Sequence, residues 1–305
     1  MQTFNCFTKP VHCTHQPGAG TLEKKHVLLK GKDVPVFVRE DSIYTGYRTT
    51  LGYTECIKSV FRLHNETVNI WSHFLGFLYF GFLLCINIFQ SHPHNRSSAD
   101  LIAVCIQLVT YQICMILSSM FHTFLCHSER VKYKWKEADH SGILIALWGT
   151  YTRIIVTNFS CFPSWLLFHL LLVTILFSLV FLQRWWNREK RQKGGVELYL
   201  FLALSMYAVA PLAHWLSISP TLVHNNTTAQ KIFWILVPYG LGGLGLFFYI
   251  SRIPERIVPP GQVDLCGASH QLWHIFILAG MVSWYDLTCW LSTTRPQSCQ
   301  LISSF

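Results

Sequence analysis

The chain of 305 residues is 51% hydrophobic and only 13% charged, and its formal net charge is +9. A soluble protein carries about 25% charged residues, so this composition argues against a soluble globular protein and favours one whose surface faces lipid. The basic residues lie between apolar runs and are not mixed with aromatic residues on a polar surface, which argues against a nucleic-acid partner. The eleven cysteines form no CxxC pair, so they predict no disulfide framework.

The first 66 residues are predicted to form a cytoplasmic region. Residues 1–19 are polar and lack the apolar segment of a signal peptide, so we expect the first membrane helix to direct insertion. Within residues 49–63 the apolar side chains recur near helical spacing, together with Lys58 and Arg62. This pattern is typical of a short helix on the inner membrane face, and an ordinary juxtamembrane linker is the alternative.

Seven stretches without Asp, Glu, Lys or Arg predict seven transmembrane helices, because about 20 apolar residues cross a bilayer as a helix. The predicted fold class is an all-α integral membrane protein, with a seven-helix bundle at residues 67–292 and a short outer or lumenal tail at 293–305. The third stretch is short, and we expect its helix to continue past Arg153 to about Thr157, with the Arg153 side chain extending to the interface. A re-entrant third segment, which would leave six spans, is the alternative. The stretches are 67–95, 101–128, 140–152, 154–183, 198–230, 232–251 and 265–285.

The distribution of basic residues predicts the orientation, since Lys and Arg concentrate in cytoplasmic loops. If the N-terminus is inside, all but four of the 24 Lys and Arg residues fall on the cytoplasmic side. The four exceptions are Arg96, Arg153, Lys231 and Arg295. Glycosylation sequons agree with a cytoplasmic N-terminus and an outer or lumenal C-terminus, because only the sequon at Asn65 falls inside. The sequons in predicted outer loops begin at Asn95, Asn158, Asn225 and Asn226.

A pair of histidines at the predicted start of the seventh helix is the first part of a candidate metal site. His270 and His274 are four residues apart, so they share one face of a helix and could coordinate one metal ion. The residues between them lack the Glu of a zincin motif, and two interfacial histidines without a metal are the alternative. The predicted topology favours the metal, because His122 falls near the inner end of the second helix and Asp139 at the inner start of the third.

Three imidazoles and one carboxylate at the same depth predict a Zn²⁺ site with three protein nitrogens and an open water position. His122, His270 and His274 are the predicted ligands, and Asp139 is expected to bond the water or act as a base. Ser118, one helical turn before His122, could add a hydroxyl to the site. Other residues of ligand type stay open as alternatives, namely Cys126, His127, His140 and Cys266.

Several segments carry a family resemblance. In chain order they are HNETVNIWSH at 64–73, SSMFH at 118–122, DHSG at 139–142, RIPER at 252–256, PGQ at 260–262 and SHQLWH at 269–274. This series, which extends over residues 42–290, resembles the progestin and adipoQ receptor family, which includes the adiponectin receptors. The resemblance implies a seven-helix bundle that holds zinc through His122, His270 and His274, with Asp139 near the bound water. The chain departs from the family at His140, where a Tyr usually stands, and the extra imidazole could compete as a ligand, which counts against hydrolytic chemistry.

Within that family, residues 46–48, 56–59 and 65–73 are most similar to a Golgi member that traps Raf kinase. This implies a multi-pass signalling regulator that holds Raf kinase at the Golgi membrane and dampens mitogen-activated kinase signalling, with the plasma membrane as the alternative location. A zinc-dependent lipid amide hydrolase is a second interpretation, with membrane ceramide as substrate and Asp139 and Ser118 as catalytic residues. A purely structural zinc and a receptor for a lipid or hormone ligand are further alternatives, and the short outer loops offer a protein hormone little surface.

Overall fold

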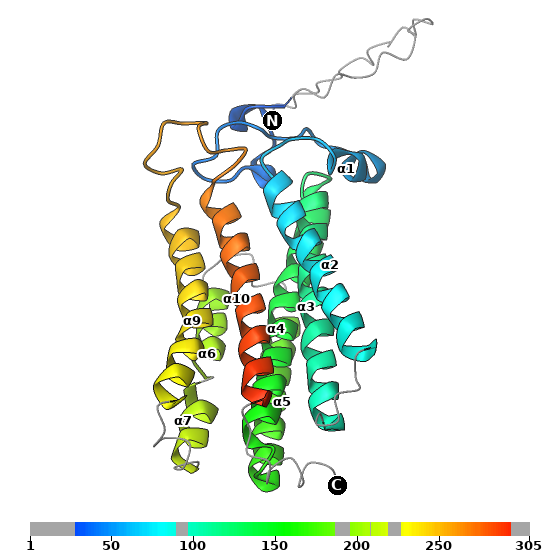
Figure 1. Cartoon of the computed structure of the whole chain (residues 1–305). Helices are drawn as coiled ribbons and strands as arrows, with labels where there is room; N and C mark the ends of the chain where they lie inside the picture. The colour runs from blue at the N-terminus through cyan, green and yellow to red at the C-terminus, as the bar shows by residue number, and fades with distance from the viewer. Residues whose placement is uncertain (1–27, 90–96, 187–195, 208, 219–226, 294–305) are drawn as a thin grey trace, which may run out of the picture.

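The structure is a computed structural model that describes residues 28–89, 97–186, 196–207, 209–218 and 227–293. Its long helices run roughly side by side as a bundle (Figure 1). Near the N-terminus the described chain adds two short 3-10 helices and an isolated antiparallel bridge between Leu29 and Tyr47. In chain order the helices are η1 (Gly31–Asp33), η2 (Val36–Val38), α1 (Tyr53–Ser59), α2 (Thr67–Phe89), α3 (Ser98–Phe124), α4 (Glu129–Phe159), α5 (Pro163–Trp186), α6 (Val196–Tyr207), α7 (Val209–Ile218), α9 (Thr227–Ser251) and α10 (Ser269–Thr293).

Six segments of the described chain are long and apolar enough to cross a membrane, so the protein is an integral membrane helical bundle. Five lie in α2, α3, α5, α9 and α10, and the sixth, Tyr199–Ile218, extends over α6 and α7. The remaining predicted span falls in α4, which is one continuous helix of 31 residues packed against α3. Polar side chains along α4, such as His140 and Arg153, lower its hydropathy, and a seventh crossing stays a prediction.

Two glycines allow α4 to approach α3 closely. A Cβ at Gly149 would overlap the Thr110 side chain, and one at Gly142 would lie 3.0 Å from the Cα of Cys114. Small residues at such crossings let helix backbones come together and gain dispersion contacts. The buried core beside this crossing draws on α2, α3, α4 and α10, and consists of Phe80, Val104, Leu108, Tyr111, Cys114, Met115, Ala146 and Met281.

Arg153 of α4 lies inside the bundle, so the prediction that its side chain reaches the interface was wrong. The residue is 0% exposed. Its guanidinium forms an ion pair with Asp100 of α3 at 3.0 Å and donates a hydrogen bond to Ser292 Oγ of α10 at 2.6 Å. A charge within a membrane protein needs partners of this kind, because the surrounding hydrocarbon offers none. These bonds join three helices at the end of the bundle away from the N-terminal segment.

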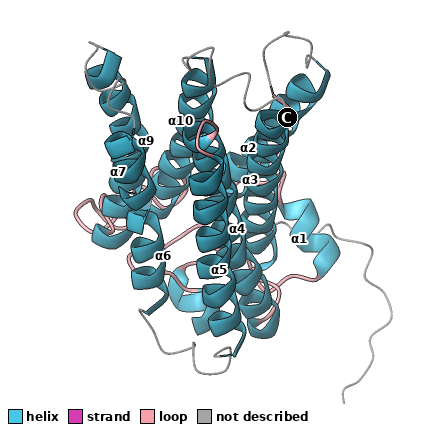
Figure 2. Cartoon of the chain, turned by 90° about the horizontal axis from the view of Figure 1, so that it is seen from below, coloured by secondary structure: helices cyan, strands magenta, loops and turns pink. Residues whose placement is uncertain are grey.

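Residues 28–66 fold over the other end of the bundle as an N-terminal cap (Figure 1). The Asp264 carboxylate, in the segment between α9 and α10, accepts hydrogen bonds from the backbone N–H groups of Tyr44 and Thr45 at 2.9 and 2.7 Å. The predicted helix within residues 49–63 is present as the shorter α1, which lies to the side of the bundle near the end of α3 (Figure 2). The cap therefore covers the ends of α3 and α10, where the predicted metal ligands lie.

Candidate metal centre

Three histidines from two helices meet beneath the N-terminal cap. His122 lies in the last turn of α3, and His270 and His274 lie in the first two turns of α10. Each offers a ring nitrogen, and the three atoms lie within 4.8 Å of one another. His122 and His274 are buried and His270 is half-buried. The arrangement agrees with the predicted ligand set, and the group could hold a metal ion.

The start of α10 is held in place by buried polar side chains. The Glu255 carboxylate caps this helix by accepting hydrogen bonds from the Ser269 backbone N–H, at 2.7 Å, and from the Ser269 hydroxyl. Gln271 Oε1 accepts from the Gly267 backbone N–H at 2.7 Å, and Gln271 Nε2 donates to the Asn65 carbonyl at 3.0 Å. These contacts orient the first turn of α10, and therefore the ring of His270, toward α3.

Glu66, which precedes the first residue of α2, is the partner of His122. Its Oε2 lies 2.7 Å from His122 Nδ1 and accepts a second hydrogen bond from Asn69 Nδ2 at 2.8 Å. Burial alone would raise the pKa of Glu66, but the hydrogen bond from His122 and the histidine charge outweigh burial and hold that pKa below its usual range. The ionised carboxylate can only accept, so Nδ1 is the donor, and in the neutral imidazole the lone pair stays on Nε2.

The buried Nε2 of His122 has no hydrogen-bond partner among the described residues. A buried ring nitrogen without a partner is costly, and a metal ion would satisfy it. A carboxylate on the far nitrogen of a histidine is also the usual surrounding of a metal-binding imidazole. The residues present therefore fit a metal such as zinc. Residue-by-residue sequence reasoning did not identify Glu66, although an acidic side chain directly before an apolar stretch was a usable signal.

Asp139 and Ser118 lie together beside the three histidines. Ser118 is buried one turn before His122 on α3, and its hydroxyl lies within electrostatic reach of the Asp139 carboxyl group of α4. The charge of His122 acts on the same carboxyl group, which places Asp139 within electrostatic reach of the group of histidines. A carboxyl group and a hydroxyl beside a bound metal ion are the components that metal-assisted hydrolysis requires.

The alternative ligands named above lie elsewhere or face other partners. Cys126 contacts Cys56 at 3.7 Å, and the His127 ring packs on Tyr53 with centroids 4.1 Å apart. The His140 ring faces Phe201 of α6 at 6.0 Å between centroids, and Cys266 is exposed. A different histidine, His73 of α2, stacks on His274 with centroids 3.8 Å apart and planes at 22°. The part of the chain that the structure describes thus groups His122, His270 and His274 without these side chains.

Comparison with known proteins identifies the family of the chain. The family described as haemolysin-III related matches residues 61–285. The chain is 33% identical over 276 residues to human progestin and adipoQ receptor family member 3, covering 88% of this chain and 87% of that protein. It is 28% identical to the Arabidopsis thaliana heptahelical transmembrane protein 1 (86% of this chain, 80% of that protein) and 27% identical to the Drosophila melanogaster adiponectin receptor protein (81% and 56%). The chain therefore belongs to the haemolysin-III-related proteins and, among them, to the progestin and adipoQ receptor family.

Proposed function

We propose that this protein is a zinc-binding, seven-helix membrane regulator of signalling that holds Raf kinase at the Golgi membrane. The observation that carries the zinc assignment is the group of His122, His270 and His274 beneath the cap, with Glu66 bonded to the far side of the His122 ring. The likeness of residues 46–48, 56–59 and 65–73 to the Raf-trapping Golgi member of the family supports the signalling assignment.

The proposed topology has a cytosolic N-terminal cap and α4 as the seventh span. The excess of Lys and Arg on the side of the cap supports this orientation. Cys161, in the turn between α4 and α5, is disulfide-bonded, which suits an oxidising lumenal or outer compartment. Cys56 and Cys126, at the opposite end of the bundle, are free thiols, as expected of a cytosolic face.

A surface on the cap that a cytosolic kinase could reach supports the tethering role. α1 and the residues after it expose the apolar side chains of Ile57, Phe61 and Leu63, which are 53%, 77% and 61% exposed. The basic side chains of Lys58 and Arg62 are exposed beside them. Apolar side chains next to charged ones are typical of protein interaction surfaces.

Expression of the full-length protein is expected to move fluorescent Raf kinase from the cytosol to the Golgi. The variant Lys58→Glu/Arg62→Glu should reduce this relocation several-fold, because reversed charges on a contact surface repel the original partner. Quantitative imaging of Raf kinase against a Golgi marker measures the effect. Arg130→Glu/Lys134→Glu, on exposed residues of α4, is the matched control and should retain relocation. Raf kinase that stays cytosolic while the wild-type protein occupies the Golgi would refute the tethering role.

A second candidate function, hydrolysis of a lipid amide such as ceramide, is favoured by a carboxyl group, Asp139, and a hydroxyl, Ser118, within electrostatic reach of each other beside His122. Bound zinc would supply Lewis acidity at this site and lower the pKa of a coordinated water. In this candidate Asp139 would accept a proton, and the Ser118 hydroxyl would donate a hydrogen bond to a developing oxyanion.

Fatty-acid release from ceramides by the purified, zinc-loaded protein is the test of the hydrolase candidate. Asp139→Asn is expected to lower the rate by about 100-fold or more, because an amide cannot act as the base. Asp286→Asn, near the other end of α10, is the control and should keep the wild-type rate. If the zinc-loaded wild-type protein releases no fatty acid from any ceramide tested, the signalling role stands alone.

A further inference from the structure

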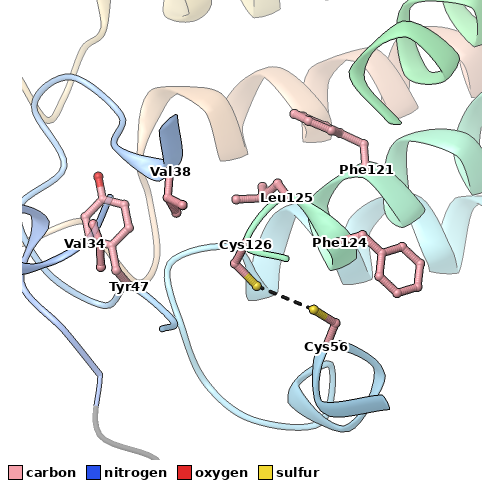
Figure 3. Packing of buried hydrophobic residues seen from close by; sticks show 8 residues of the cluster. All are labelled: Val34, Val38, Tyr47, Cys56, Phe121, Phe124, Leu125 and Cys126. Carbon is pink, nitrogen blue, oxygen red and sulfur yellow. Dashed lines mark hydrogen bonds between the residues drawn. The ribbon is translucent and has the colours of Figure 1, made fainter. Parts of the chain in front are cut away.

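Cys56 and Cys126 form a buried pair of thiols outside the metal centre. Cys56 lies in α1, and Cys126 follows the last turn of α3, so the two are 70 positions apart in sequence. Their Sγ atoms are 3.7 Å apart, and both residues are 0% exposed (Figure 3). An S–S bond of about 2.05 Å requires the two atoms to approach by about 1.7 Å, which a small shift of α1 and side-chain rotation can supply.

The surroundings of the pair favour a reactive thiol on Cys126. The hydrogen bond with Cys56 and the positive charge of Arg48 lower the pKa of Cys126 to about 7, although burial opposes this. The same hydrogen bond and burial raise the pKa of Cys56. A thiolate at neutral pH is the form that reacts with oxidants, and a neighbouring thiol can then resolve the product.

α1 is a short helix with few buried side chains, so a bond between these two thiols would change how firmly it is attached to the bundle. It is only seven residues long, and Cys56 and Ser59 are its buried residues. Apart from the thiol contact, the exposed Tyr53 ring packs on Phe124 and His127. Two polar bonds complete the attachment: Arg48 donates to Ser59 Oγ at 2.9 Å, and Trp71 donates to the Val60 carbonyl just after α1 at 2.9 Å. A short helix held by few buried side chains can open locally and admit a small oxidant.

We propose that Cys56 and Cys126 are a reversible thiol–disulfide pair that locks α1, and with it the N-terminal cap, onto the end of α3. With hydrogen peroxide as oxidant, the Cys126 thiolate takes one oxygen to form a sulfenic acid, and hydroxide leaves. The Cys56 sulfur then attacks the Cys126 sulfur, the S–S bond forms, and water leaves. The two thiols together lose two electrons, which reduce the peroxide, and a thiol reductant reverses the reaction.

The disulfide would also affect hydrogen bonds to the backbone of His122, a predicted metal ligand. Arg48, which is bonded to α1 through Ser59, also donates to the carbonyl of His122 at 2.6 Å and to that of Thr123 at 3.0 Å. In the disulfide form α1 cannot leave α3, so Arg48 stays on these carbonyls. In the dithiol form the cap can open.

The test uses full-length protein in detergent, treated with hydrogen peroxide, quenched, alkylated under denaturing conditions and analysed by peptide mass spectrometry. A peptide linking Cys56 to Cys126 should appear, alkylation of both residues should fall by about tenfold, and dithiothreitol should reverse both changes. The apparent unfolding temperature should rise by about 5 °C on oxidation of the wild type, because the link closes a long loop.

Variants distinguish this link from other oxidation. Cys126→Ser should abolish both the linked peptide and the rise in unfolding temperature, whereas Cys114→Ser, which removes a different buried thiol, within α3, should preserve both. The measurement on wild-type protein needs no variant to fold. If Cys56 and Cys126 are still alkylated in full after peroxide treatment, or if the link joins either of them to a different cysteine, the proposal is overturned.

Discussion

Purified full-length protein is expected to carry about one zinc ion per chain, and the double variant His270→Ala/His274→Ala is expected to carry none. The reason is that α10 supplies two of the three ring nitrogens that lie within 4.8 Å of one another. A single remaining imidazole on α3 cannot hold the ion against its hydration. Elemental analysis of detergent-purified protein, dialysed without chelator, measures the metal content directly.

A second pair of histidines provides the matched control. His169 Nε2 and His214 Nδ1 lie 2.8 Å apart on α5 and α7, outside the group that could hold a metal. His169→Ala/His214→Ala removes the same number of imidazoles and should leave the zinc content unchanged. Wild-type protein without zinc, or equal zinc in the wild type and the α10 double variant, would contradict the metal assignment.

The variant Glu66→Gln is expected to weaken zinc binding without abolishing it. Glutamine keeps the size of the side chain but loses the charge that orients the His122 ring, so zinc should bind about 10- to 100-fold more weakly. Competition with a fluorescent chelator measures this affinity. Glu55→Gln, on an exposed residue of α1, is the control and should bind zinc as the wild type does.

Loss of the Arg153 side chain is expected to be the most destabilising change among the charged residues discussed. Arg153→Leu removes the positive charge that compensates the buried Asp100 carboxylate, which costs about 3–5 kcal/mol. The apparent unfolding temperature in detergent should fall by about 10 °C. Intrinsic-fluorescence thermal melts of the purified protein measure this shift.

An exposed ion pair of the same kind is the control. Arg252 Nη1 lies 2.6 Å from Asp41 Oδ2, and their side chains are 49% and 75% exposed. Arg252→Leu should cost less than about 1 kcal/mol, because water screens and replaces the pair. Arg153→Leu/Asp100→Leu should recover much of the lost stability, since both buried charges are removed together. An unfolding temperature for Arg153→Leu equal to that of Arg252→Leu would show that the buried pair contributes no more than the exposed one.

The sequence alone determined the class of the protein and most of the candidate site. Hydropathy over about 20 residues depends only on local composition, so apolar runs located the helices that could cross a membrane. The i, i+4 spacing placed His270 and His274 on one helix face. Successive loops lie on alternate sides of the membrane, which placed His122 and Asp139 at the same end of the bundle. The family resemblance, which the comparisons confirmed, named the same residues.

Only the tertiary structure decided which polar side chains meet. Glu66 and His122 are 56 positions apart, Arg153 and Asp100 are 53 apart, and Cys56 and Cys126 are 70 apart. Hydropathy gives the length and depth of a helix but not its rotation about its own axis, and rotation decides which side chains face the bundle. This is why Arg153, with a position near the predicted membrane boundary, was expected to reach the interface and instead forms a buried ion pair that joins α3, α4 and α10.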